Sequence, residues 1–156
     1  EICMIIRSFH PGDEKPLSRL TGTVFMRYIA SGYSREGVNE FMEYVSEKNI
    51  LERIIDGNHY IMIASKGRII VGVIEIREFR HISLFFVDGR HQRKGIGSML
   101  MEKTLELCRV MNPILQRLSV NSSPFAVPVY INLGFIAEGD EMEKKGVRFT
   151  PMSYSL

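Results

Sequence analysis

The stretch VDGRHQRKGIGSML, residues 87–100, lies where a run of β-formers gives way to a helical pattern. Three cationic side chains and a histidine crowd a short loop, two glycines follow, and no carboxylate occurs between Asp88 and Glu102. A helix N-terminus presents unpaired N–H groups and about half a positive charge. Gly95 and Gly97 let the main chain approach a ligand closely, because no Cβ atoms intervene. The loop therefore suits a diphosphate or a similar polyanion.

Two known phosphate-binding motifs fail when their spacing is counted. A P-loop needs Gly-x-x-x-x-Gly-Lys-[Ser/Thr], but five residues separate Gly89 from Gly95, and Ile96 stands at the lysine position. A dinucleotide fingerprint needs a third glycine three places after Gly97, where Leu100 stands. The predicted ligand thus carries phosphate but is held by neither of those folds. The structural alternative is a tight glycine turn with solvated cations.

The length and composition of the chain favour one globular domain. Its 156 residues can bury a single core, and we expect the domain to span residues 1–156. With 45% hydrophobic and 24% charged residues it resembles an ordinary soluble protein. The formal net charge of +2 is too small to indicate nucleic-acid binding by itself.

The same sequence gives no sign of a membrane or secretory protein. No apolar run approaches the ~18 residues needed to cross a bilayer. The opening EICMIIRSF lacks a basic leader and a long apolar stretch, so no secretory signal is expected, although residues can precede Glu1. Cys3 and Cys108 have no metal-like spacing, which is typical of buried thiols in a reducing compartment. We therefore expect a cytoplasmic protein.

Hydrophobic periodicity predicts seven strands and four helices in the order β, α, α, β, β, β, α, β, α, β, β. The expected strands cover residues 2–8, 59–65, 68–76, 81–87, 114–120, 135–142 and 147–155. The expected helices cover 17–30, a segment capped by Ser34, 95–111, and a segment that opens at Ser123-Pro124 and ends at Gly134. This order indicates a mixed α/β (α+β) chain whose sheet has an antiparallel middle and crossover helices near residues 95–133.

The second expected helix has two different faces. Its buried stripe is expected to consist of Val38, Phe41, Met42 and Val45. Its other face is acidic and consists of Glu36, Glu40, Glu43 and Glu47. We expect this acidic face to be solvated, with attraction of a cationic substrate as the alternative.

The loop and a downstream segment together carry a family resemblance. Gln92-Arg93-Lys94-Gly95-Ile96-Gly97 lies between an apolar strand and an amphipathic helix. It resembles the Gln/Arg-x-x-Gly-x-Gly/Ala signature of the GNAT superfamily, N-acyltransferases that use acetyl-CoA or another acyl-CoA. Asn121-Ser-Ser-Pro-Phe-Ala126, followed by Tyr130 and Gly134-Phe135, is similar to the family's Asn…Ala…Tyr…Gly-Phe segment. The resemblance implies a mostly antiparallel GNAT-like sheet of about seven strands with four helices, splayed between the fourth and fifth strands.

The resemblance also implies where acetyl-CoA would bind as co-substrate. Strand 82–87 would splay from strand 114–120, and the pantetheine arm would lie between them, bound by main-chain groups as an added strand would be. The amides of residues 92–98 would hold the pyrophosphate. The implied cofactor-binding residues are Phe85, Val87, Gln92, Arg93, Lys94, Gly95, Ile96, Gly97, Ser98, Asn121 and Ala126. For Asn121, capping of the helix beside Ser123 is the alternative.

Acetyl transfer to an amine needs a neutral amine, a polarised thioester carbonyl and a proton for the departing thiolate. By resemblance Tyr130 is the acid, since a phenol with a pKa near 10 can protonate a thiolate of comparable basicity. Packing in the core is the alternative role of this tyrosine. A main-chain N–H near Val87 is available in principle to polarise the carbonyl.

The general base is left open by the sequence. Aligning the strand before the signature places Ser83 where many family members carry a glutamate, and a serine cannot act as a base unaided. Glu75 is the catalytic candidate, with His81, Asp88 and water as alternatives. Glu75 could instead lie on a solvated strand face, and His81 could simply begin its strand.

The predicted function is N-acetyl transfer from acetyl-CoA to a primary amine of a small molecule or peptide, directly and without a covalent enzyme intermediate. The alternative is a CoA-binding sensor without turnover. Nucleic-acid binding through Arg90, Arg93 and Lys94 is a weaker hypothesis, because the cations are few and no aromatic residues interleave with them.

No membrane partner is expected, and a homodimer is suggested only by the family. His10, His59 and His91 lack clustered Cys, Asp or Glu partners, so no metal is expected.

Overall fold

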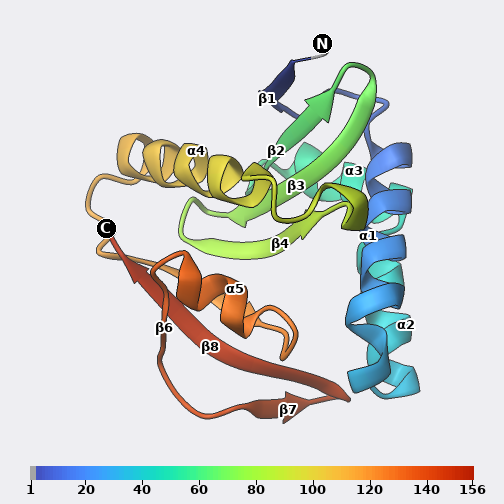
Figure 1. Ribbon diagram of the computed structural model, residues 1–156, viewed down its shortest axis with the longest axis vertical. Helices are drawn as coiled ribbons and strands as arrows, with labels where there is room; N and C mark the ends of the chain where they lie inside the picture. Colours follow the sequence, from blue (N-terminus) through green and yellow to red (C-terminus); the bar gives the residue numbers. More distant parts are fainter. Residues whose placement is uncertain (1–2) are drawn as a thin grey trace.

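A mixed, mostly antiparallel sheet forms the centre of the computed structural model, which describes residues 3–156 (Figure 1). Its strands are ordered β1-β2-β3-β4-β5-β8-β6, and β7 pairs with β8. The strands are β1 (Met4–Ser8), β2 (His59–Lys66), β3 (Ile69–Arg77), β4 (His81–Val87), β5 (Arg117–Ser122), β6 (Ile136–Ala137), β7 (Met142–Lys144) and β8 (Val147–Ser155). The helices are α1 (Glu14–Tyr28), α2 (Arg35–Tyr44), α3 (Glu47–Asp56), α4 (Ile96–Met111) and α5 (Val127–Asn132), with 3-10 turns η1 (Ala30–Gly32) and η2 (Gly89–His91).

Apolar side chains of the sheet form two cores, one under α4 and α5 and one under α1 and α3 (Figure 1). Successive residues of β3 alternate between them: Val73 belongs to the α1–α3 core and Ile74 to the α4 core. Helix α4 approaches β3 so closely that a Cβ on Gly72 would lie 3.1 Å from side-chain atoms of Ile96 and Leu100. This contact fixes the first turn of α4 against the sheet.

Strands β4 and β5 diverge, as the family resemblance implies. They pair in parallel only at His81 with Ser119 and at Ile82 with Val120. Beyond that point β5 continues to pair with β8 on its other side, as far as Ser122. Strand β4 therefore runs on to Val87 with a partner on one side only, which is β3. The other strand contacts are antiparallel, so the predicted fold class is confirmed.

The segment after Ser34 forms two helices, where the sequence analysis expected one. Ser34 caps α2 as predicted, and its hydroxyl accepts a hydrogen bond from the Gly37 amide at 3.1 Å. However, Ser46 caps a new helix by accepting from the Asn49 amide at 3.3 Å, so α2 stops at Tyr44. An N-cap serine needs a non-helical main chain, which is why the helix is interrupted there. Residues 3–156 thus contain five α-helices instead of four.

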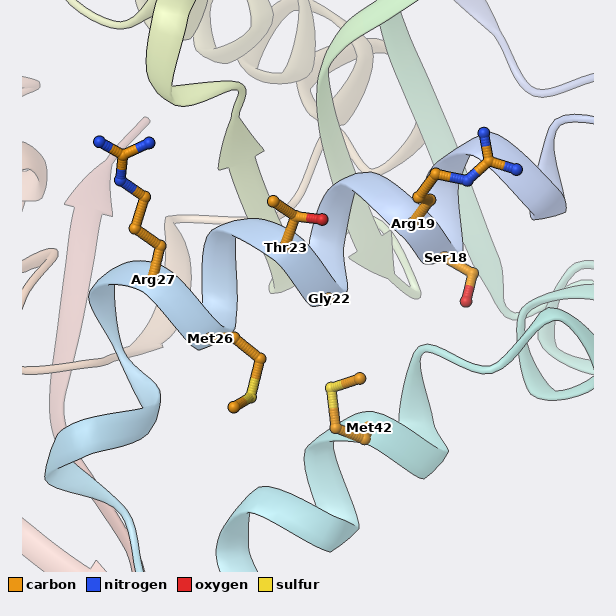
Figure 2. A pocket seen from close by; sticks show the side chains of 7 residues that line it. All are labelled: Ser18, Arg19, Gly22, Thr23, Met26, Arg27 and Met42. Atoms are coloured by element: carbon orange, nitrogen blue, oxygen red, sulfur yellow. The ribbon is translucent and has the colours of Figure 1, made fainter.

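Met42 was expected in the buried stripe of the second helix, but it is exposed in the structure. Its residue surface is 40% exposed, and it faces Met26 across the groove between α1 and α2 (Figure 2). The groove has a volume of about 550 Å³. A Cβ built on Gly22 would lie 3.3 Å from the Met42 methyl group. Arg19 and Arg27 point away from α2 (Figure 2). No carboxylate lines this hollow, which lies away from the loop of residues 87–100.

Three further expectations near the ends of elements are wrong. The expected strand 135–142 is split into β6 and β7, because Pro151 of β8 lies between their pairing partners and has no N–H to donate. Ser123 caps only a turn, by accepting from the Ala126 amide at 3.3 Å, so α5 begins at Val127. Cys108 is buried as expected, whereas Cys3 is exposed. Residue 2 of the expected first strand lies outside the described residues.

Candidate active site

The loop between β4 and α4 has the form that its sequence predicts. Gly95 is the N-cap of α4 and has a φ of +81°, a conformation that glycine adopts without strain. Arg93 also has a positive φ, of 63°, which is uncommon for a residue with a side chain. The Gln92 side chain donates from Nε2 to the Val87 carbonyl at 3.1 Å and ties the loop to the end of β4.

The main-chain amides of residues 92–98 are unpaired within the described residues. The His91 amide donates to Asp88 at 2.8 Å and the Met99 amide donates to Gly95 at 3.0 Å. Between them, no amide from Gln92 to Ser98 donates to an acceptor within residues 3–156. A run of free amides at a helix N-terminus is what an anion receptor requires.

The side chains around these amides leave room for a ligand. Nothing lies within 4 Å of a Cβ built on Gly95, whereas a Cβ on Gly97 would be 3.3 Å from the Phe85 ring. The absent side chain of Gly97 thus lets the first turn of α4 lie against β4. Ile96 is buried, so only its amide is available, while Ser98 is exposed in the first helical turn.

The charge of the loop comes from Arg93 and Lys94. Arg90 is held by Asp88, with 3.3 Å between Nη2 and Oδ2. Arg93 and Lys94 are exposed and form no ion pair within the described part of the chain. They can therefore direct their charge to an anion at the mouth of α4.

A bulge in β4 determines which side chains face the diverging strands. Glu75 pairs with Leu84 and Ile76 pairs with Ile82, so Ser83 is an extra residue in β4. A bulge shifts the alternation of faces by one residue. Phe85 and Val87 consequently pack on the α4 core, and Phe86 packs on the α1–α3 core. The main chain of residues 83–87 forms an edge on its β5 side, where an extended ligand can add as a strand does.

Tyr130 lies across this divergence from Phe85. The two rings have centroids 5.8 Å apart, and the Phe135 ring lies 5.2 Å from Tyr130 on another side. Only 5% of Tyr130 is exposed, and burial raises the pKa of its phenol above the ordinary value. Its hydroxyl makes no hydrogen bond to any residue of the range 3–156. Burial thus favours the protonated form of this phenol, and its ring lies beside Phe85 of β4.

Asn121 and Ala126 lie at the end of β5 and in the turn that follows it. Asn121 is exposed, and within residues 3–156 its side chain caps no helix, because Ser123 caps that turn instead. The carbonyl of Ala126 accepts from the Tyr130 amide at 3.0 Å and so helps to position the tyrosine. A hollow of about 320 Å³ opens beside Ser98, between α4 and the Tyr154 side chain of β8.

Glu75 is buried in an ion-pair network and does not lie on a solvated strand face. Its carboxylate is 0% exposed. Arg53 donates to both oxygens, from Nε at 2.9 Å and from Nη2 at 3.1 Å, and His59 Nδ1 lies 2.6 Å from Oε2. Tyr44 donates its hydroxyl to Oε2 at 3.2 Å. Burial alone would raise the pKa of Glu75, but the hydrogen bonds from His59 and Arg53 outweigh it and lower the pKa.

The partners of Glu75 are residues that the sequence analysis did not select. They come from α2, α3 and β2, and no local motif connects them. The Arg53 guanidinium also lies 3.7 Å from the centroid of the Tyr44 ring, a cation–π contact. Burial and the Glu75 charge raise the pKa of Tyr44 to about 12. The Ser83 hydroxyl acts in the opposite direction on this pKa. The only signal in the sequence was Glu75 itself, a carboxylate in an apolar strand.

The two other candidate bases lie at opposite ends of β4. His81 is at the paired end, where Nδ1 lies 2.7 Å from the Ser119 hydroxyl, and burial together with Arg77 and Arg80 lowers its pKa. Asp88 follows Val87 at the open end. Burial would raise the pKa of Asp88, but the hydrogen bonds from Arg90 lower it, so this carboxylate is ionised and already bound.

Neither a metal-binding group nor a membrane-spanning helix occurs among the described residues. Within residues 3–156, no three His, Cys, Asp or Glu side chains are grouped so that they could hold a metal ion. Over the same range, no helix is long and apolar enough to cross a membrane.

The comparisons with known proteins agree with this geometry. The family model of the acetyltransferase (GNAT) domain matches residues 29–156, which is most of the chain. The chain therefore belongs to the GNAT acetyltransferase family. No curated protein sequence matches it.

Solved structures share the fold at low sequence identity. A GCN5-related N-acetyltransferase from Rhodopseudomonas palustris has a TM-score of 0.83 at 19% identity, covering 100% of this chain and 98% of that one. The PaiA N-acetyltransferase from Thermoplasma acidophilum, in complex with coenzyme A, has a TM-score of 0.83 at 14% identity, covering 99% and 100%. The spermidine N-acetyltransferase from Vibrio cholerae, in complex with CoA and spermine, has a TM-score of 0.69 at 18% identity, covering 97% and 95%.

Proposed function

We propose that this chain transfers an acetyl group from acetyl-CoA directly to the nitrogen of a primary amine on a small molecule or peptide. The observation that carries the proposal is the run of unpaired amides from Gln92 to Ser98. This run follows β4, which pairs with β5 only at its first two residues. Membership in the GNAT family supports the same reaction class.

The residues present fit coenzyme A. The amides of 92–98 would hold the pyrophosphate, with added charge from Arg93 and Lys94. The main chain at Phe85 and Val87 would bind the pantetheine arm along the unpaired edge of β4. Asn121 and Ala126 would border the arm from the end of β5. Two of the structures with this fold were determined with CoA bound, which supports the assignment.

Acetyl-CoA supplies a thioester whose carbonyl carbon accepts the amine nitrogen, so that a C–N bond forms and the C–S bond breaks. Tyr130 would donate its hydroxyl proton to the departing sulfur, and the phenolate would then be reprotonated from water. Burial supports this role, because a raised pKa keeps the phenol protonated. A main-chain N–H near Val87 would stabilise the negative charge that develops on the carbonyl oxygen.

For the proton that leaves the amine, we propose that Glu75 acts through Tyr44. The Glu75 oxygens are occupied and buried, so they do not reach an acceptor directly. The Tyr44 hydroxyl donates to Glu75, and its pKa is influenced by Ser83, the bulge residue of β4. A proton from the amine would pass to this hydroxyl as its own proton moves to Glu75. Removal of the proton by water alone is the alternative.

The test of cofactor binding is a melting curve with and without acetyl-CoA. Ligand at about 100 times its dissociation constant stabilises a fold by roughly 2.7 kcal/mol, a shift of several degrees for a chain of this length. The double variant R93Q/K94Q should lose most of this shift. The matched variant K144Q/K145Q, which removes two exposed cations from the β7–β8 turn, should keep it. An equal shift in both variants would contradict the proposed phosphate site.

A second candidate function is binding of CoA without turnover, as in a sensor. The complete pairing of Glu75 favours it, because this carboxylate is not free to act as a direct base. Screening of a broad amine panel for thiol release separates the two functions: a sensor shows the thermal shift with CoA and releases no thiol.

A further inference from the structure

An aromatic pair joins α1 to the turn after β5. Tyr28 is the last residue of α1, and Phe125 lies between β5 and α5. Their rings are stacked, with centroids 5.0 Å apart and an interplanar angle of 25°. Phe125 is 44% exposed although it is a large apolar side chain, and Tyr28 is half-buried. The pair therefore presents an aromatic surface that the protein itself leaves uncovered.

This pair lies at the open end of the diverging strands. The Tyr28 hydroxyl is 2.6 Å from the position of a Cβ built on Gly89, so it touches the turn directly after β4. Phe125 follows the end of β5 by three residues. The stack thus spans the ends of the two strands whose separation the proposed reaction uses, on the side formed by α1.

The surroundings of the pair are aromatic along α1 and α2. Phe25 stacks on Phe41 with centroids 3.9 Å apart, and Phe41 lies 5.6 Å from Phe86 of β4. Tyr33 meets Phe25 edge to face at 5.2 Å. The face of β4 turned toward α1 and α2 therefore packs against rings.

The charged groups near the pair do not suit a polycation. Arg27 lies 5.4 Å from the centroid of the Tyr28 ring. Three carboxylates of the described residues form ion pairs: Asp88 with Arg90, Glu75 with Arg53, and Glu141 with Arg148. A polyamine would therefore meet a like-charged guanidinium at this surface.

We infer that the acceptor is a monoamine carried on a flat apolar frame, such as an arylalkylamine, which stacks on Tyr28 and Phe125. The inference rests on the proposed function and names the acceptor class for it. The aromatic frame would bury the exposed face of Phe125, and its amino group would extend toward the end of β4. Offset ring stacking supplies both affinity and orientation for such a frame.

The experiment compares 2-phenylethylamine, n-butylamine and spermidine as acceptors in a thiol-release assay with acetyl-CoA. The wild type should have the highest kcat/KM for 2-phenylethylamine. In F125L, the ratio of kcat/KM for 2-phenylethylamine to that for n-butylamine should fall roughly tenfold, the size of one lost aromatic contact, and mainly through KM. The matched control I114A removes another exposed apolar side chain, after α4, and should leave the ratio as it is.

Other outcomes overturn the inference. A preference for spermidine or n-butylamine, or a ratio that is the same in F125L and wild type, excludes this acceptor class while leaving acetyl transfer intact. If no amine is turned over, the proposed function fails, and saturation-transfer NMR with CoA and 2-phenylethylamine decides the inference separately. The wild type must then transfer saturation to the ring protons of 2-phenylethylamine, and F125L must not. If the wild type shows no such transfer, the inference is wrong.

Discussion

Tyr130 shows how its surroundings can give one side chain a chemical role. The ring packs between Phe85 and Phe135, while the hydroxyl has no protein partner within the described residues. Because burial disfavours the phenolate, the pKa of Tyr130 is raised and the group remains an acid over the whole working range of pH. The pattern of sequence around it suggested this role, but only the packing explains why the proton stays on the phenol.

Replacement of Tyr130 by phenylalanine tests the role of its hydroxyl. We expect Y130F to lower kcat by about 100-fold, because general acid catalysis commonly contributes that much. The melting shift with acetyl-CoA should persist, since the ring remains. Thiol-release assays at a series of pH values check the prediction. A kcat equal to that of wild type at every pH would remove Tyr130 from the acid role.

The mouth of α4 is an element whose function follows from local geometry. A glycine at the N-cap with a φ of +81° turns the chain so that the first amides of the helix point outward. Helix α4 is then held by contact with Gly72 of β3. The proposed anion site therefore depends on a turn encoded within a few residues and on a helix anchored to the sheet.

Replacement of Gly95 by alanine tests this turn, and Gly57 offers a matched control. Both glycines have a φ near +80°, 81° and 82°, and a Cβ on either meets nothing within 4 Å. Each alanine variant should therefore lose about 1 kcal/mol of unfolding free energy, the strain of a left-handed alanine. Only G95A should also weaken CoA binding, by roughly tenfold or more, because it alone distorts the amide receptor. Urea unfolding and calorimetric titration measure the two effects, and equal CoA affinities would refute the assignment.

Across the whole molecule, buried charge connects the helices to the sheet. Arg53 of α3 binds Glu75 of β3 through both oxygens, donates to the Tyr44 carbonyl at the end of α2 at 2.6 Å, and covers the Tyr44 ring. Removal of one member leaves the others buried and uncompensated. This network is structural as well as a candidate route for the proton.

Replacement of Glu75 by glutamine tests the network in both respects. E75Q should lose about 3–5 kcal/mol of unfolding free energy, because Arg53 is left buried without its counter-charge. The matched variant E52Q breaks the exposed Lys48–Glu52 pair and should change the unfolding free energy by less than about 1 kcal/mol.

If Glu75 also relays the proton, E75Q and Y44F should lower kcat/KM and alter the acid limb of its pH profile. A kcat/KM profile unchanged in both variants would favour water as the base.

The pH dependence of stability has a definite sign. Hydrogen bonds lower the pKa of Glu75 in the folded chain below its unfolded value, so its contribution to stability is complete above the unfolded pKa. That contribution should be lost as the pH falls below about 4.5, toward the folded pKa. Urea unfolding at a series of pH values should show a smaller acid loss for E75Q than for wild type. Parallel pH curves for the two proteins would contradict the lowered pKa.

The sequence by itself determined the features that are encoded locally. The Ser34 cap, the glycine turn before α4 and most of the order of strands and helices could be predicted, because caps, glycine turns and hydrophobic periodicity involve residues a few positions apart. The divergence of the fourth and fifth strands was implied by the family resemblance. The family resemblance came from motifs of the same short range. The break at Ser46 was also locally encoded, but the continuous apolar stripe concealed it.

Only the tertiary structure decided which distant residues meet. The enclosure of Glu75 by Arg53 and His59, the stack of Tyr28 on Phe125 and the interruption of the last strands opposite Pro151 each join segments far apart in the sequence. Pairings of this kind depend on how the helices pack on the sheet, and no periodicity records them. For that reason the glycine turn before α4 could be predicted from the order of residues, whereas the ion pairs of Glu75 and the exposed Tyr28–Phe125 stack could not.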